Sequence, residues 1–238
     1  MPKVQDLMFN GPEGKLEGRF LASAERNAPA ALCLHPHPLH GGTMNNKVVY
    51  NAFHALAELD FSVLRFNFRG CGKSQGTFNN GVGELADAAC ALDELQELTS
   101  EASSYWIVGF SFGSWIQMQL LMRRPEVAGF IAIAPPAQSY DFSFLSPCPA
   151  QGLIIHGTAD QIVPEKAVFS FYEKLNKQKH ASVEYTSING ANHFFKDHMD
   201  ELRSSIASYM KPRVSTMEPI PVKLKRDRRR RQGVPGDE

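Results

Sequence analysis

From Tyr105 onward the chain reads YWIVGFSFGSWIQMQL. The first four residues are apolar and predict a buried strand, and the mostly apolar run at the end predicts a helix. Between them, Gly109 to Gly113 fit the pattern G-x-S-x-G. A serine on so sharp a turn needs small neighbours, and the helix start behind it favours developing negative charge. The stretch therefore predicts an α/β fold that displays Ser111 as a nucleophile, the alternative being a plain strand-to-helix turn with a serine cap.

Strands and helices alternate along the rest of the chain. Hydrophobic periodicity and turn residues predict strands over residues 4–9, 16–22, 30–34, 61–68, 106–109, 130–134, 152–155 and 182–188. They predict helices over residues 46–59, 82–98, 113–124, 164–177 and 196–210. The first two strands flank a turn and indicate a hairpin. Alternation of this kind predicts a mostly parallel, twisted sheet with helices on both faces.

Composition indicates a globular protein without a membrane span. The 238 residues are 43% hydrophobic and 21% charged, which suits one α/β domain and argues against wholesale disorder. No run of about 18 apolar residues occurs, and the N-terminus lacks the apolar stretch of a signal peptide. We therefore expect a cytoplasmic protein whose four scattered cysteines stay reduced: Cys33, Cys71, Cys90 and Cys148.

The neutral total charge hides a basic C-terminus. Residues 211–238 hold nine Lys and Arg against four Asp and Glu, and they have few large apolar side chains. We therefore expect an α/β domain over residues 1–211 and a disordered basic tail over residues 212–238. The tail is either a solvated extension or a contact for nucleic acid or an acidic partner, and a basic run alone does not predict nucleic-acid binding.

A base must lie within hydrogen-bond reach of a serine hydroxyl to activate it. Three of the eight histidines lie late enough to follow an acid: His180, His193 and His198. His193 follows a predicted strand, so it falls at the carboxyl edge of the sheet, where Ser111 is displayed. His180 precedes that strand, at the opposite edge, and His198 falls in the last helix. His193 is therefore the predicted base.

The acid that orients the base should also follow a strand. Asp160 ends the segment GLIIHGTAD, which reads as a strand and a tight loop. Its rival, Asp141, follows two prolines with no strand directly before it. Capping of the helix near Pro164 is the alternative role for Asp160. We expect Asp160 to hold the imidazole tautomer and to stabilise the imidazolium.

An oxyanion hole needs two backbone donors. The N–H of Phe112, directly after the nucleophile, is the first. The second is expected from the loop HPHPLHGGT after the strand over residues 30–34. Pro36 and Pro38 have no N–H, so His37 supplies the first available donor and Leu39 is the fallback.

The order of serine, aspartate and histidine is that of the α/β-hydrolases, and the chain resembles this superfamily over about residues 4–210. Within it, the chain is similar to small bacterial serine hydrolases. The resemblance is carried by the segments HPHPLHGGT, FNFRGCGKS, GFSFG, GTAD and ANH, over residues 35–43, 66–74, 109–113, 157–160 and 191–193. It implies an esterase-like enzyme that needs neither metal nor cofactor.

Two other motifs are weaker. His35, His37 and His40 have the spacing of a zinc motif, but Leu39 stands where an aspartate usually lies. The segment GKS at residues 72–74 resembles the end of a phosphate-binding loop, but Asn67 replaces its first glycine. We therefore predict neither a metal site nor nucleotide binding.

The combined prediction is a serine hydrolase that cleaves a small carboxylic ester through an acyl-enzyme intermediate. About 16 residues near residues 135–150 stand where lids insert, too few for a full cap domain. Six aromatic residues are candidates for the pocket floor: Phe110, Phe112, Tyr140, Phe142, Phe144 and Phe194. A thioesterase, a dienelactone-like hydrolase or a peptidase would use the same residues. A binding protein that uses the basic tail, and a homodimer, stay open.

Overall fold

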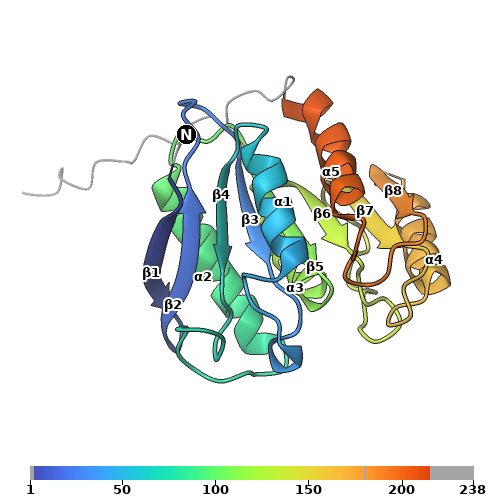
Figure 1. Cartoon of the computed structure of the whole chain (residues 1–238), viewed down its shortest axis with the longest axis horizontal. Helices are drawn as coiled ribbons and strands as arrows, with labels where there is room; N and C mark the ends of the chain where they lie inside the picture. Colours follow the sequence, from blue (N-terminus) through green and yellow to red (C-terminus); the bar gives the residue numbers. More distant parts are fainter. Residues whose placement is uncertain (1–2, 180, 215–238) are drawn as a thin grey trace, which may run out of the picture.

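The computed structural model describes residues 3–179 and 181–214 and contains an eight-stranded sheet (Figure 1). The strands are β1 (Gln5–Gly11), β2 (Gly14–Leu21), β3 (Ala30–Leu34), β4 (Ser62–Phe66), β5 (Tyr105–Phe110), β6 (Val127–Ile133), β7 (Gln151–Gly157) and β8 (Val183–Ile188). The helices are α1 (Lys47–Ala57), α2 (Val82–Leu98), α3 (Phe112–Leu121), α4 (Glu165–Asn176) and α5 (Met199–Val214), with a short 3-10 helix η1 (Pro38–His40).

The predicted strands and helices are confirmed, with ends that move by up to four residues. The sheet order is β1-β2-β4-β3-β5-β6-β7-β8. Strands β3 to β8 run parallel, and the hairpin β1–β2 joins β4 antiparallel. Among the described residues, the one element that the sequence did not indicate is η1, which lies where we expected only a turn.

Helices cover the sheet on both faces, as predicted. One apolar core lies between the sheet and helices α2, α3 and α4, and it includes Phe66, Phe130 and Phe171. The second core lies between the sheet and helices α1 and α5, and it includes Phe53 and Trp106. In Figure 1, α1 and α5 lie in front of the sheet, and α2 and α3 lie behind it. Both faces of strands β3 to β7 are therefore buried, which explains their mostly apolar sequences, whereas the edge strand β8 is partly exposed.

Strand register brings four loops to one edge. Leu34 of β3 pairs with Gly109 of β5, Gly109 pairs with Ala132 of β6, and Gly157 of β7 pairs with Ile188 of β8. The parallel strands therefore end side by side, at the lower edge of the sheet in Figure 1. The loops that follow β3, β5, β7 and β8 contain His37, Ser111, Asp160 and His193, and Phe112 is the first residue of α3.

Helix α5 extends beyond the residue at which we expected it to end. It continues through Pro212 to Val214. A proline lacks the N–H that would bond the preceding turn, but Arg213 compensates: its guanidinium donates to the Tyr209 carbonyl, pairs with Glu184 and lies over the Tyr209 ring. The tail predicted to be disordered lies outside the described residues from residue 215 onward. No helix among the described residues is long and apolar enough to cross a membrane.

All four cysteines are free thiols. Burial raises the pKa of Cys33 to about 12 and that of Cys71 to about 11. The pKa values of Cys90 and Cys148 are also raised, again mainly by burial. These thiols are therefore almost wholly protonated at neutral pH.

Candidate active site

The turn between β5 and α3 holds Ser111 in a backbone conformation that few residues adopt, with φ 53° and ψ −120°. Such a conformation costs about 1–3 kcal/mol and persists only where its surroundings enforce it. The Ser111 N–H donates to Ile133 O at 2.9 Å, and the Ser111 carbonyl accepts from the N–H and the hydroxyl of Ser114. A side chain at Gly109 or Gly113 would collide with backbone, because a Cβ at Gly113 would lie 2.5 Å from Leu34 O. Both glycines of the pattern are therefore sterically required.

Ser111, His193 and Asp160 form one hydrogen-bonded chain. The Ser111 Oγ lies 3.1 Å from His193 Nε2, and His193 Nδ1 lies 2.7 Å from Asp160 Oδ2. The imidazole is 5% exposed and packs against the rings of Phe110 and Phe194. Sequence reasoning selected these three residues from separate loops, and the structure brings them together.

Asp160 accepts hydrogen bonds on both carboxylate oxygens. While Oδ2 faces His193, Oδ1 accepts from the N–H groups of Ile162 and Val163, each at 2.8 Å. Burial by itself would raise the pKa of this carboxyl group. The hydrogen bonds from His193 and from the two amides outweigh burial, so the pKa of Asp160 lies below its ordinary value. Asp160 is therefore ionised at neutral pH and can stabilise a positively charged His193.

His156, on β7, is a site residue that the sequence analysis missed. It is fully buried, and its Nε2 donates to Val163 O at 3.0 Å. The same nitrogen lies 3.7 Å from Asp160 Oδ2. Burial lowers the pKa of His156, which keeps it neutral beside the carboxylate. His156 therefore fixes the loop whose amides hold Asp160. Its place in HGTAD, four residues before the acid, is the signal that could have revealed it.

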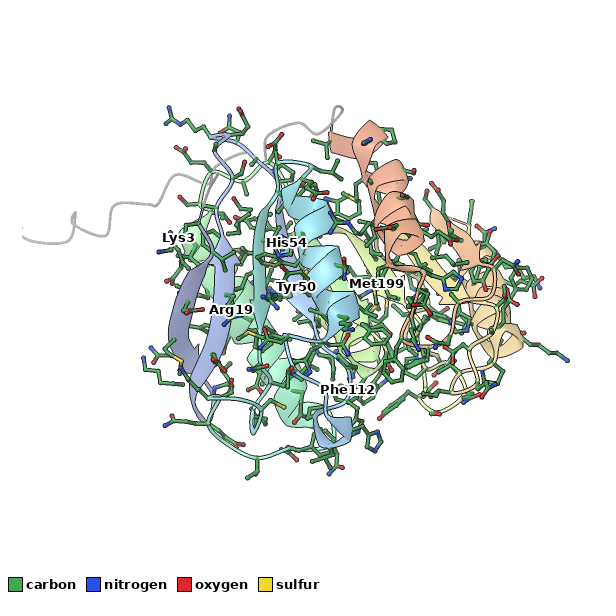
Figure 2. All side chains as sticks on the ribbon, in the orientation of Figure 1. Lys3, Arg19, Tyr50, His54, Phe112 and Met199 are labelled. Carbon is green, nitrogen blue, oxygen red and sulfur yellow. The ribbon has the colours of Figure 1, made fainter. Side chains whose placement is uncertain are left out.

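The two predicted oxyanion donors lie close together, His37 in the loop after β3 and Phe112 at the start of α3. The rings of His37 and Phe112 pack with centroids 4.9 Å apart, and Phe112 lies at the lower edge of the sheet in Figure 2. Within the part of the chain that the structure describes, neither N–H donates to a protein acceptor. The fallback, Leu39, donates its N–H to His37 Nδ1 at 3.2 Å. The geometry therefore favours His37 over Leu39, because the Leu39 donor is already used inside the loop.

His35 anchors this loop and is not arranged as a metal ligand. The buried ring accepts from Phe68 N–H at Nε2, at 3.0 Å, so its Nδ1–H donates to Pro36 O at 2.6 Å. Burial lowers the pKa of His35 to about 4. Both ring nitrogens of one member of the apparent zinc motif are thus occupied. Within residues 3–179 and 181–214, no three His, Cys, Asp or Glu side chains are grouped to hold a metal ion.

The loop after β4 is fixed by a buried ion pair. Arg69 and Asp87 are each 2% exposed or less, and the guanidinium contacts both carboxylate oxygens, at 2.9 Å and 2.7 Å. In the nearby segment GKS, Ser74 Oγ donates to Asn67 O, and Lys73 N–H donates to Glu17. These groups hold the loop to the hairpin, so the resemblance to a phosphate-binding loop reflects a structural turn.

The structure leaves two rival residues, Asp141 and His198, out of the hydrogen-bonded chain at Ser111. Asp141 accepts from the N–H and the hydroxyl of Ser143 on an exposed loop. His198 is half-buried and contacts Lys196 O, and it lies just before α5 rather than in the last helix, where we expected it. His180 lies outside the described residues. Among the aromatic candidates for the pocket floor, Phe110 and Phe112 are buried next to the nucleophile, whereas Phe194 is 51% exposed.

Comparison with known proteins shows the same family. A family model described as alpha/beta hydrolase fold matches residues 39–148. The uncharacterized protein RP471 of Rickettsia prowazekii (strain Madrid E) is 52% identical over 211 residues, which are 87% of this chain and 89% of that protein.

Solved structures extend the likeness over nearly the whole described chain. ATU1826 of Agrobacterium tumefaciens, a protein of unknown function, is 51% identical with a TM-score of 0.86, over 91% of this chain and 100% of its own. An α/β serine hydrolase homologue from Coxiella burnetii is 38% identical with a TM-score of 0.80, over 88% and 98% of the two chains. XC6422 of Xanthomonas campestris, an α/β serine hydrolase without a lid, is 34% identical with a TM-score of 0.80, over 88% and 94%. On this evidence the chain belongs to the α/β-hydrolase family, and its homologues include α/β serine hydrolases.

Proposed function

We propose that the protein is a metal-independent serine hydrolase that cleaves small carboxylic esters through an acyl-enzyme intermediate. One observation supports this above all: Ser111 Oγ, His193 and Asp160 form a continuous hydrogen-bonded chain, with distances of 3.1 Å and 2.7 Å, on a strained turn. An activated serine of this kind suits attack on a carbonyl carbon.

In the proposed first step, Ser111 Oγ attacks the ester carbonyl carbon and its proton moves to His193 Nε2. The carbonyl oxygen gains the negative charge and accepts hydrogen bonds from the N–H groups of His37 and Phe112. When the tetrahedral intermediate collapses, the C–O bond to the alcohol breaks, and the alcohol takes the proton from His193. Asp160 stabilises the imidazolium while it carries that proton.

In the second step, water replaces the alcohol. His193 removes a proton from the water as its oxygen attacks the acyl carbon. Collapse of the second intermediate breaks the bond to Ser111 Oγ, which recovers its proton from His193, and the carboxylic acid leaves. Charge stabilisation comes from backbone amides in both steps, so no metal ion is required.

The test uses a fluorophosphonate probe together with hydrolysis of 4-nitrophenyl acetate. We expect the probe to label Ser111, as located by peptide mass spectrometry. Ser111→Ala should abolish labelling and lower kcat/KM by roughly three or more orders of magnitude. Ser139→Ala, at an exposed serine on the neighbouring loop, is the matched control and should keep wild-type activity.

Two further arms separate the proposal from its alternatives. Activity that disappears with EDTA and returns with zinc would contradict the metal-independent route. Thioester, lactone and peptide substrates, assayed beside the acetate ester, would identify a different acyl preference on the same residues. Labelling at any residue other than Ser111 would overturn the assignment of the nucleophile.

We also propose a cytoplasmic location, because the four cysteines are unpaired thiols, as is usual in reducing compartments. Periplasmic recovery of the native protein in a fractionated cell would contradict this proposal.

A further inference from the structure

The four most exposed large apolar side chains of the described residues all lie at one edge of the sheet. They are Val82 (74% exposed), Leu39 (67%), Ile162 (54%) and Phe194 (51%). Each follows a different parallel strand, so all four share the carboxyl edge with Ser111, the lower edge in Figure 1. Single exposed apolar residues are common on folded proteins, but a set gathered around one site marks an interaction surface.

The order of the strands places these side chains on both sides of the nucleophile. Ser111 follows β5 and is half-buried. Leu39 follows β3, and Val82 begins α2 after β4, so both lie on one side of β5 in the sheet order. Ile162 follows β7 and Phe194 follows β8, so both lie on the other side. The four residues therefore flank the proposed active site, and together they are called the apolar rim.

Two members of the apolar rim adjoin the base and the acid. The Phe194 ring lies edge-on to the His193 imidazole, with ring centroids 5.2 Å apart. The Ile162 N–H donates to Asp160 Oδ1 at 2.8 Å, while the Ile162 side chain points outward and is exposed. On this side of the site, the apolar surface therefore begins next to the proposed catalytic groups.

The other two members adjoin the proposed oxyanion donors. Leu39 N–H donates to His37 Nδ1, and the His37 ring packs 4.9 Å from the ring of Phe112. Directly before Val82, the N-cap glycine of α2 leaves no room for a side chain beside the Trp115 ring, which lies 5.8 Å from that of Phe112. The apolar rim is therefore packed onto the site from this side too.

The loops at this edge carry few charges. They are residues 35–46, 67–81, 158–164 and 189–198 and the segment between β6 and β7, which we call the β6–β7 segment (residues 134–150). These loops hold six charged side chains among 61 residues, about half the proportion of 21% in the whole chain. Arg69 and Asp160 are buried. The exposed four are Lys73, Asp141, Lys196 and Asp197, two of each sign. The face around Ser111 is therefore apolar and neutral overall.

An apolar and neutral face suits the surface of an amphiphile aggregate. Apolar side chains can enter the boundary between headgroups and acyl chains, and the scarcity of charge lowers the cost of that entry. Attraction to an anionic membrane depends on clusters of Lys and Arg, whereas the two exposed lysines here are balanced by two aspartates. A partner protein seated on the apolar rim would close the route to Ser111, but a lipid surface would deliver an ester to it.

We propose that the carboxyl edge of the sheet docks onto neutral or zwitterionic amphiphile aggregates through the apolar rim and takes its substrate from their surface. This inference rests on the proposed ester hydrolysis and deepens it, because it names the substrate class as an ester held in a lipid–water interface. The four side chains enter the aggregate around the ester, and Ser111 meets the carbonyl group at the boundary with water.

The first experiment measures binding without turnover. Full-length Ser111→Ala protein is sedimented with vesicles of dioleoylphosphatidylcholine. We expect Val82→Glu to weaken binding at least about tenfold, because it puts a charge into the apolar rim, and Val82→Ser to weaken it less. An acidic residue suits the first turn of a helix, so Val82→Glu should fold. Leu98→Glu, at the other end of α2 and about 24 Å away, is the matched control and should bind like the parent.

The second experiment compares an ester in solution with an ester in an aggregate. The substrates are 4-nitrophenyl acetate in buffer and 4-nitrophenyl dodecanoate in dioleoylphosphatidylcholine vesicles. In the protein with Ser111 intact, Val82→Glu should lower the rate on vesicles at least about tenfold. It should change acetate hydrolysis less than about twofold, because no hydrogen bond of the proposed catalytic chain is touched.

The binding experiment separates failure of the docking surface from failure of the proposed chemistry. Binding that Val82→Glu weakens supports the docking surface even where no ester is cleaved. Binding that requires anionic lipid and disappears on truncation after Val214 would assign the contact to the basic C-terminus and overturn the proposal. Absence of binding to the vesicles, equal effects of Val82→Glu and Leu98→Glu, or a dimer that Val82→Glu dissociates would also overturn it.

Discussion

The turn at Ser111 and the β6–β7 segment lie side by side at the carboxyl edge of the sheet, but they are held in different ways. Backbone contacts fix the turn: Ser111 N–H bonds to Ile133 O, and Gly113 packs directly on the carbonyls of β3. Side chains fix the β6–β7 segment (residues 134–150): Trp115 of α3 donates to Asp141 O, and Gln178, just after α4, donates to Leu145 O. Backbone packing therefore positions the proposed nucleophile. The β6–β7 segment, in contrast, is held by side-chain contacts that a single substitution can remove.

The largest expected effect comes from Gly113→Val. Its side chain would start 2.5 Å from Leu34 O and 2.6 Å from His35 O, both in backbone that cannot move without breaking the sheet. We expect an unfolding free energy lower by about 2–4 kcal/mol and an ester hydrolysis rate reduced by roughly three orders of magnitude. Urea denaturation and 4-nitrophenyl acetate hydrolysis measure both. Gly190→Ala, at a positive φ with no atom closer than 3.6 Å, should cost only about 1 kcal/mol. Equal effects of the two substitutions would refute the steric explanation.

The stability of the protein should depend on pH through His35, which lies in the loop after β3. Its pKa is lowered from 6.5 to about 4, so the unfolded chain binds a proton more readily than the folded protein does. Stability is therefore full above pH 6.5 and declines as the pH falls towards 4, by about 3 kcal/mol from this residue. Urea denaturation at several pH values tests this. His35→Asn, which cannot titrate, should show a shallower decline, and His198→Asn should match the wild type. Parallel curves for His35→Asn and the wild type would contradict the prediction.

A smaller effect is expected when the β6–β7 segment loses its anchor. Gln178→Ala leaves Leu145 O and Cys148 N–H without their partner, which costs about 1–3 kcal/mol. Acetate hydrolysis should change less than about twofold, because no backbone contact of Ser111 is touched. Thermal melts and the acetate assay measure these quantities, with Lys177→Ala as the neighbouring control. Loss of acetate activity together with stability would show that the two regions are held as one unit.

The smallest effect is expected at the C-terminus. Truncation after Val214 should leave the melting temperature and acetate activity nearly unchanged, because residues 215–238 offer little apolar surface whose burial would offset the cost of ordering them. Truncation after Lys211 should lower the melting temperature by a few degrees, because it removes the contacts of Arg213 with Tyr209 and Glu184. A marked drop in the melting temperature after truncation at Val214 would indicate that the tail packs against the domain.

Local sequence predicted the features that depend on neighbouring residues. Gly109 and Gly113 identify the sharp turn because no other residue fits there, and the alternating apolar runs predict the sheet. Asp160 and His193 were predicted because the carboxyl ends of parallel strands share one edge. Their hydrogen-bonded contact is seen only in the structure, while their catalytic roles stay predictions.

Features that depend on residues far apart in the sequence were not predicted. His156 and Gln178 act through carbonyls and amides that only the fold brings near them. The end of α5 was misplaced because Pro212 signals a stop, whereas the contacts of Arg213 with Glu184 and Tyr209 carry the helix on. The short helix η1 was missed because Pro38, its first residue, is equally typical of a turn.

The four protonated thiols make the protein a convenient background for site-directed labelling. Alkylating reagents react with thiolates, and the pKa values of all four native cysteines are raised. A cysteine introduced at the exposed Ser139 would therefore react with maleimide well before any native thiol. A fluorophore placed there would report on the β6–β7 segment during turnover without prior removal of the natural cysteines.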